Sequence, residues 1–376
     1  MFNPARLTLA RHRNRLTKKA LAEALGLDQK TIIRYETEGQ IPSKDSLVAI
    51  ARLLSFPQEF FFGGDLDEMP VEAASFRSLK SMSAKDRDAA LAAGSIAFLL
   101  DDWVAARFDL PSPDLLDLKE DIDAESAADT LRQRWALGNR PISNMIHLLE
   151  AKGVRVFSLA ENTKTVDAFS MWRRSTPYVF LNTFKTSERS RFDAAHELGH
   201  LVLHKHGGPH DKGSDIEGDD PFQEPGPDAE HQANRFASAF LMPRADVLAK
   251  LPRANNLNQL IQAKRIWGVS VAALNYRLHK LGAVSDWQYR IFNIQISQNY
   301  KQSEPNGLAR ETSAVWEKVI SILRAEGTTK QSISKALALP VAELESLLFG
   351  LFKMQSIDGG GQAGSSGRAK LKLVPK

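Results

Sequence analysis

The sequence has 376 residues, of which 43% are hydrophobic and 25% charged, with a formal net charge of +4 and no cysteine. This length exceeds what one hydrophobic core usually serves, so two or three domains are expected. The lack of cysteine excludes disulfide bonds and cysteine-based zinc sites, so a metal ion would have to be held by His, Asp or Glu. The longest apolar run, residues 89–100, is too short to span a bilayer, and the basic start lacks the apolar core of a signal peptide. We therefore expect a cytoplasmic protein with no membrane partner.

Residues 1–66 are predicted to form a compact all-helical domain, because apolar residues recur there at helical spacing. Thr17 has the position of a helix cap, and Gly26 lies where a tight turn between two helices needs a small residue. Residues 1–60 hold ten Lys or Arg against six Asp or Glu. Such an excess favours nucleic acid as a partner, although a solvated helical surface carries similar charge about as often.

Residues 67–123 are predicted to be a helical connector. Its main element is a long amphipathic helix over residues 84–108, which Pro111 and Pro113 bring to an end.

Residues 124–245 combine helices with short strands. Alternation of apolar residues predicts a small antiparallel sheet. A helix over residues 186–204 follows, and then a loop at 207–228 that holds seven acids against one lysine. A further helix is expected to end at Leu241. The predicted helices before the sheet cover 124–137 and 141–152, and the predicted strands cover 154–157, 168–171 and 178–181.

The remainder is predicted to be helical. Residues 246–300 and 301–356 each contain a pattern that resembles helix–turn–helix, for which structural or protein contact is favoured over DNA contact. The Gly-rich and Ser-rich residues 357–376 are expected to be a disordered tail. The expected fold class is therefore α+β and mostly helical.

The segment His196-Glu197-Leu198-Gly199-His200 carries the main chemical signal. On a helix, residues four apart share a face, so both imidazoles can bind one metal ion. Glu197 lies one residue step from them, where a carboxylate can act as general base on a water molecule without binding the metal. Gly199 lowers helix propensity, which suggests that another segment approaches the backbone there. Two surface histidines on an amphipathic helix are the alternative.

A catalytic zinc ion usually takes three protein ligands and leaves a fourth position open. Glu230 opens the next helix and is the expected third ligand, while Asn234, one turn on, is expected to brace a histidine. His231 is a competing ligand, and Asp228 a weaker one. His204 and His206 are expected to be solvated residues at a helix end, with catalytic assistance or a second ion as the alternative.

With these residues identified, the chain resembles the ImmA/IrrE group of zinc metallopeptidases over residues 124–285. The resemblance rests on residues 191–200 (RFDAAHELGH), on residues 230–237 (EHQANRFA) and on the helical segments at 267–270 and 277–282. It implies a zincin-like core that binds Zn²⁺ and acts as a gluzincin-like endopeptidase. The implied substrate is a DNA-bound repressor of the Xre type, cleaved in a stress or mobile-element response. The long acidic loop at 207–228 departs from the family pattern.

The N-terminal domain resembles an Xre/Cro-type helix-turn-helix domain, on residues 16–22, 26–27, 31–36 and Gly39. In such a domain the second helix enters the major groove, and Lys18 is expected to face phosphate. A dimer on two half-sites is a further expectation, and a protein-binding module of the same fold is the alternative. The side chains expected to meet the bases are Gln29, Lys30, Thr31 and Arg34.

Two functions follow from these patterns. The first is a regulatory zinc endopeptidase that cleaves a specific protein. The second is a DNA-binding regulator or antitoxin-like repressor whose zinc site is structural or sensory. Glu197 favours the first, because a carboxylate that is no ligand has no structural duty in a metal site.

Overall fold

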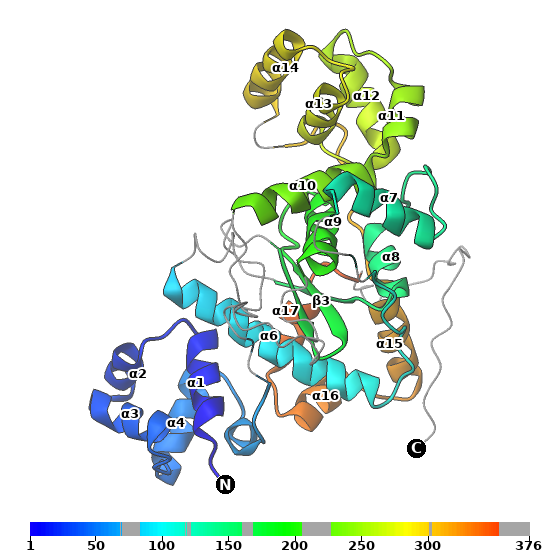
Figure 1. Cartoon of the computed structure of the whole chain (residues 1–376). Coiled ribbons are helices and arrows are strands. Elements are labelled where there is room, and N and C mark those ends of the chain that lie inside the picture. Colours follow the sequence, from blue (N-terminus) through cyan, green and yellow to red (C-terminus); the bar gives the residue numbers. More distant parts are fainter. Residues whose placement is uncertain are drawn as a thin grey trace, which may run out of the picture.

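The computed structural model describes residues 1–67, 69, 83–116, 118, 122–159, 168–204, 227–300 and 303–352. The predicted acidic loop lies outside these residues except at its last two positions, and the predicted tail lies wholly outside them. The fold is mostly helical with one small sheet, as the sequence predicts (Figure 1). The helices are α1 (Pro4–Arg13), α2 (Lys18–Leu25), α3 (Gln29–Thr37), α4 (Lys44–Leu54), the 3₁₀ helix η1 (Gln58–Phe62), α6 (Ala84–Ala105), α7 (Ala124–Arg134), α8 (Met145–Ala151), α9 (Ser187–Leu203), α10 (Pro227–Leu241), α11 (Arg244–Lys250), α12 (Leu257–Trp267), α13 (Val271–Lys280), α14 (Asp286–Asn299), α15 (Ala314–Ala325), α16 (Lys330–Leu337) and α17 (Val341–Leu348).

Helices α1–α4 form the N-terminal domain, and α2 and α3 make its helix–turn–helix. The Thr17 side chain accepts a hydrogen bond from the backbone of Ala20, which caps α2. Gly26 ends α2 with φ of 66°, a left-handed conformation that glycine adopts without strain. Arg11 and Glu36 form a buried ion pair at 2.6 Å, which joins α1 to α3. The turn and the cap expected from the sequence are therefore present.

The sheet contains β1 (Arg155–Ser158), β2 (Phe169–Arg173) and β3 (Thr176–Leu181) in the order β1-β3-β2. It is mixed, so the prediction of an antiparallel sheet was wrong for one of its two pairings. A two-residue turn joins β2 to β3 and makes that pair antiparallel. No such turn joins β1 to its neighbour β3, and these strands run parallel.

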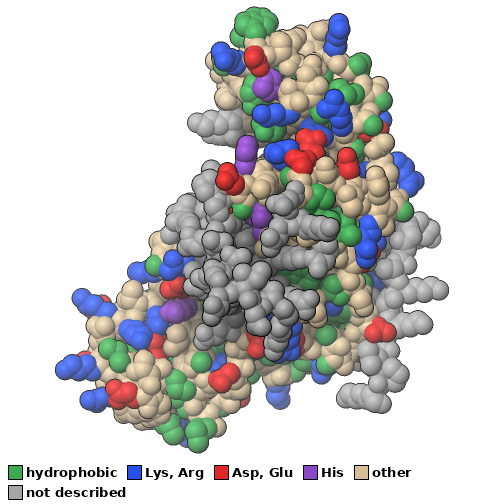
Figure 2. Space-filling model, viewed as in Figure 1, with side chains coloured by type: hydrophobic (Ala, Val, Ile, Leu, Met, Phe, Trp, Pro, Cys, Tyr) green, Lys and Arg blue, Asp and Glu red, His purple; other side chains and the backbone are tan. Residues whose placement is uncertain are grey.

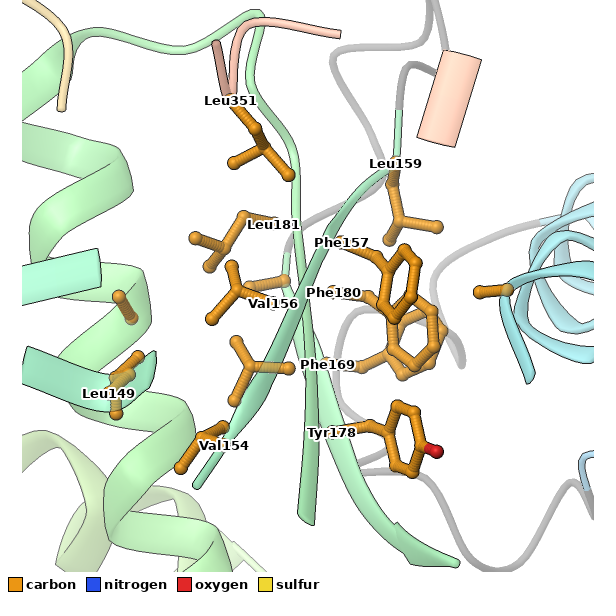
Figure 3. Close-up of a cluster of buried hydrophobic side chains, with 14 of the residues drawn as sticks. Leu149, Val154, Val156, Phe157, Leu159, Phe169, Tyr178, Phe180, Leu181 and Leu351 are labelled. Atoms are coloured by element: carbon orange, nitrogen blue, oxygen red, sulfur yellow. The ribbon is translucent and has the colours of Figure 1, made fainter. Parts of the chain in front are cut away.

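The two faces of the sheet pack against different helices (Figure 3). Phe157, Phe169, Tyr178 and Phe180 lie on one face, towards α6, where Phe98 packs edge-on to Tyr178 with ring centroids 4.9 Å apart. The opposite face packs against α9. Because α9 carries the predicted metal-binding motif, the sheet is the rigid support of the candidate site.

The C-terminal helices pack against this core. The Trp316 indole of α15 donates a hydrogen bond to the Val156 carbonyl of β1 at 3.1 Å. The buried carboxylate of Glu150 in α8 accepts hydrogen bonds from the Ser313 hydroxyl and from the backbone of Ala314 and Val315. Burial raises the pKa of Glu150 to about 7 despite these hydrogen bonds.

Helices α11–α14 form a cluster at the far end of the molecule from α1–α4 (Figure 1). It is joined to α9 through Lys264 of α12, a lysine with 0% exposure. The Lys264 ammonium lies 2.9 Å from Glu188 at the start of α9 and 3.2 Å from Glu304. A buried lysine requires such partners, so this cluster has a defined position against α9.

In the part of the chain that the structure describes, no helix combines the length and the apolar composition that a membrane crossing requires.

Candidate metal centre

Helix α9 presents the two histidines on one face. Its first turn is capped by Thr186, whose side chain accepts a hydrogen bond from the Arg189 backbone. His196 and His200 follow one turn apart, with ring centroids 4.7 Å apart. Their Nε2 atoms are 3.0 Å apart, so both point to the same small region. His200 is fully buried.

Glu230, in the first turn of α10, reaches the same region. One carboxylate oxygen lies 3.3 Å from Nε2 of His196, and the other lies 3.4 Å from Nε2 of His200. The ligand atoms of the three residues all lie within 4.8 Å of one another. Two imidazoles and one carboxylate are a donor set of catalytic zinc sites. The three residues named from the sequence are therefore brought together.

Gly199 allows α10 to approach α9 this closely. A Cβ atom at Gly199 would lie 3.1 Å from the Phe236 ring and 3.3 Å from the Ala233 Cα, both in α10. A larger residue would push the helices apart and move Glu230 away from the histidines. The close approach expected at Gly199 is thus present.

The pKa values of the three groups shift in different directions. Burial lowers the pKa of His200 to about 3, so this imidazole is neutral near pH 7. Burial opposes ionisation of Glu230, but its contacts with His196 and His200 outweigh burial and hold the pKa of the carboxyl well below its usual range. Burial also acts to lower the pKa of His196, and Glu230 and Glu197 together raise it.

A hydrogen-bonded chain behind His200 determines which of its nitrogens carries the proton. Nδ1 of His200 lies 3.1 Å from Nδ1 of His204, whose Nε2 lies 3.1 Å from the amide oxygen of Gln232. An amide oxygen can only accept, so Nε2 of His204 carries a proton. Burial lowers the pKa of His204, and a neutral His204 then accepts at Nδ1. This chain favours a proton on Nδ1 of His200, which leaves Nε2, on the side of Glu230, available to bind a cation.

This arrangement directs a lone pair of His200 and an ionised carboxylate towards the same region. A protonated His196 beside them balances their charge, and a bound metal ion would replace that proton. The donor set and its convergence therefore fit a divalent metal ion of the zinc type.

The other residues named from the sequence for this site have different surroundings. Asn234 is half-buried, and within the described residues no hydrogen bond joins it to His196 or His200. In this structure His204 makes the contact to a histidine that was expected of Asn234. His231 and Asp228 are exposed and do not belong to the cluster. His206 lies outside the described residues.

Sequence reasoning missed the contacts of Glu197 and the role of Gln232. Glu197 is buried, and its Oε2 accepts a hydrogen bond from the Ser170 hydroxyl of β2 at 2.7 Å. Ser170 also contacts the Glu197 carbonyl at 3.2 Å. A serine among the apolar residues 168–171 was the one available sign that this strand contributes a polar group to the site.

The predicted DNA-contacting residues lie on the outer face and at the start of α3. Lys18, at the start of α2, is half-buried with its ammonium 3.5 Å from Glu36, so its charge is partly balanced. Figure 2 shows Lys and Arg side chains spread over the N-terminal helices at the lower left. Gln29, Lys30 and Arg34 are exposed, and Thr31 is partly exposed.

Two family models match the chain, one over the N-terminal domain and one over the segment that holds the candidate metal centre. Residues 149–279 match the family model Peptidase_M78, the IrrE N-terminal-like domain. Residues 9–57 match the model of a helix-turn-helix domain. The chain joins a helix-turn-helix domain to an IrrE N-terminal-like domain. No curated protein matches the chain.

The matched IrrE N-terminal-like domain includes the whole candidate metal centre. Its residues 149–279 run from the end of α8 to α13 and so contain β1–β3 and the helices α9 and α10. Helix α6, which covers the aromatic face of the sheet, and the helices α15–α17 lie outside the match. The matched helix-turn-helix residues extend from α1 to the end of α4.

Proposed function

We propose that the chain is a zinc-dependent endopeptidase of the ImmA/IrrE type. The observation that carries the proposal is the convergence of two histidine nitrogens and one carboxylate beside a second, buried glutamate. In this proposal His196, His200 and Glu230 hold the ion. Bound zinc supplies Lewis-acid chemistry, which makes water a nucleophile near neutral pH and polarises a carbonyl group.

Glu197 is the proposed general base. Its carboxylate takes a proton from the attacking water and passes it to the nitrogen of the leaving amine. The hydrogen bond from Ser170 to Oε2 orients this carboxylate. Ser170 lies on the strand β2, which packs directly against α9, so the sheet positions the base as well as the ligands.

The proposed substrate is a DNA-binding repressor of the Xre type. The support is the helix-turn-helix domain carried by the same chain, which can place the peptidase on DNA beside a bound repressor. That domain is tied to the body by ion pairs from Arg13 to Glu343 and from Arg15 to Asp86, each at 2.8 Å. Recognition and cleavage would then act within one connected molecule.

Cleavage of a purified repressor tests this proposal. A repressor with an Xre-type domain, encoded beside the gene for this chain, should be cut at one position, and mass spectrometry of the products identifies it. A zinc chelator should stop the reaction, and added zinc should restore it. Glu197→Gln should fold but leave the repressor intact. Cutting by the Glu197→Gln chain at the parent rate would contradict the proposed role.

DNA binding by residues 1–66 is the second part of the proposal. Arg34→Ala should cost about 1–3 kcal/mol at one position of the cognate site and so relax discrimination there. Lys18→Ala should weaken binding to all sequences alike and reduce the slope of affinity against salt by about 1. The matched control is Arg290→Ala, which removes an exposed arginine from α14. Fluorescence anisotropy of the full chain at several salt concentrations measures each effect.

Binding that is absent or insensitive to salt would favour a protein-docking module. A homodimer on two half-sites stays a prediction.

A DNA-binding regulator with a structural or sensory zinc site is the alternative function. The exposed side chains at the start of α3 favour DNA contact whether or not the chain is a peptidase. In that case Glu197→Gln would leave both zinc content and gene regulation unchanged.

A further inference from the structure

A cavity of about 610 Å³ lies between α6, the segment that follows β3, and the C-terminal helices α15–α17. Cavities of this size are typical of sites for small organic ligands. Helix α6, which lines it, packs against the aromatic face of the sheet, whereas α9 with the candidate metal centre packs against the other face. Its walls are almost entirely apolar, with main contributions from Leu100, Val104, Val319, Leu323, Ile333 and Leu348.

One of the positively charged groups that line the cavity has no carboxylate partner among the described residues. Lys330 and Glu345 pair with each other at 2.7 Å. The Arg310 guanidinium donates a hydrogen bond to the Lys185 carbonyl at 3.1 Å and has no carboxylate partner in the described part of the chain. Arg310 is exposed at the edge of the cavity, and partial burial of its guanidinium lowers its pKa. The cavity therefore suits a ligand with a single negative charge.

An exposed aromatic pair in the lining points to an apolar ligand. Phe184 and Phe349 both line the cavity, stack with ring centroids 4.9 Å apart, and are 50% and 46% exposed. Exposed aromatic pairs beside a cavity are typical of binding surfaces. Trp103 also lines the cavity, and its buried indole N–H, which has no hydrogen-bond partner among the described residues, is a donor for a polar atom of the ligand.

We propose that this cavity binds a medium-chain monocarboxylate, a fatty acid, with the hydrocarbon chain between the helices and the carboxylate on Arg310. A hydrocarbon chain has no polar atoms that these walls would leave unsatisfied. A peptide in the same place would bury backbone amides against apolar walls, which costs free energy. A phosphorylated ligand, with about two negative charges, would call for a cluster of cations, and Arg310 alone is uncompensated.

Polar contacts connect the cavity to α1 of the helix-turn-helix domain and to α9 of the candidate metal centre. Helix α17 lines the cavity through Leu344 and Leu348, and its Glu343 accepts a hydrogen bond from Arg13 of α1 at 2.8 Å. On the other side, the Lys185 that contacts Arg310 also pairs with Asp193 of α9 at 3.0 Å. A ligand here would act as an effector placed between the helix-turn-helix domain and the metal-binding helix. Its binding does not depend on the proposed peptidase activity.

Calorimetric titration of the full chain with decanoate and with 1-decanol tests the proposal. The two probes share a ten-carbon chain and differ in the charge of the head group. Decanoate should bind once per chain, about tenfold more tightly than decanol, because a charge-assisted hydrogen bond at a partly exposed site has about that effect. Tryptophan fluorescence provides a second readout, since Trp103 and Trp316 both line the cavity.

Three variants locate the site. Arg310→Gln should reduce the affinity for decanoate to that for decanol. Ile320→Trp, which places a large ring in the cavity, should abolish binding of both. Arg324→Gln, an exposed arginine of α15 that does not line the cavity, should change neither.

Several results would overturn the proposal. They are the absence of decanoate binding, equal affinity for decanoate and decanol in the parent, and binding that survives Ile320→Trp. Tighter binding of an apolar peptide with a free carboxyl terminus than of decanoate would also overturn it and assign the cavity to a peptide.

Discussion

His200→Ala should abolish tight zinc binding, with a loss of affinity greater than about a hundredfold. Removal of an outer-shell partner alone costs about 10–100-fold, and His200 is a proposed ligand whose lone pair faces Glu230. Elemental analysis of the purified parent should give one zinc per chain, and competition with a chromophoric chelator gives the dissociation constant. His196→Ala and Glu230→Ala should behave in the same way.

Glu197→Gln is the matched control for these variants. It changes a buried residue in the same helix and leaves all three proposed ligands in place. Its zinc content should equal that of the parent, since the proposed role of Glu197 is to move a proton and not to bind metal. If the Glu197→Gln chain lost zinc while His200→Ala kept it, Glu197 would be a zinc ligand and His200 would not.

His204→Ala should weaken zinc binding by about 10–100-fold, the usual cost of losing an outer-shell partner. Without His204, Nδ1 of His200 loses this partner, and the imidazole can rotate or present the wrong nitrogen. Gln232→Ala should have a smaller effect in the same direction, because it removes the group that orients His204. The chelator competition described above measures both.

Asn234→Ala provides the control for this prediction. Asn234 lies in the same helix as Gln232 but has no hydrogen bond to a histidine in the described residues, so its loss should leave zinc affinity unchanged. The opposite pattern, with weaker binding in Asn234→Ala and none in His204→Ala, would show that the contact between His200 and His204 has no part in metal binding.

The clustering of His196, His200 and Glu230 could be predicted in outline because its signals are local. Two histidines four apart must share a helix face, and an acid that opens the next helix is placed to meet them. The brace of His200 could not be predicted in the same way. It depends on how α10 is rotated against α9, and this rotation depends on the packing of Phe236 on Gly199.

For the fold, too, local features could be predicted from the sequence and long-range contacts could not. Alternation along β1–β3 predicts strands and the faces of their side chains, but contains no information on strand direction, so the parallel pairing of β1 with β3 was missed. The contact of Arg13 with Glu343 joins residues 330 positions apart, and nothing in either local sequence indicates it. The cavity beside Arg310 likewise arises only when α6 and α15–α17 are brought together.

The central claim, that this chain is a specific zinc endopeptidase, is tested most directly by comparing new protein N-termini in cells. Cells that express the parent chain are compared with cells that express Glu197→Gln under an inducing stress. We predict that one protein, or a very few, shows a new N-terminus in the parent cells alone, and that a repressor with an Xre-type domain is among them. Identical sets of N-termini in the two strains, with the parent chain fully loaded with zinc and the stress response active, would contradict the claim.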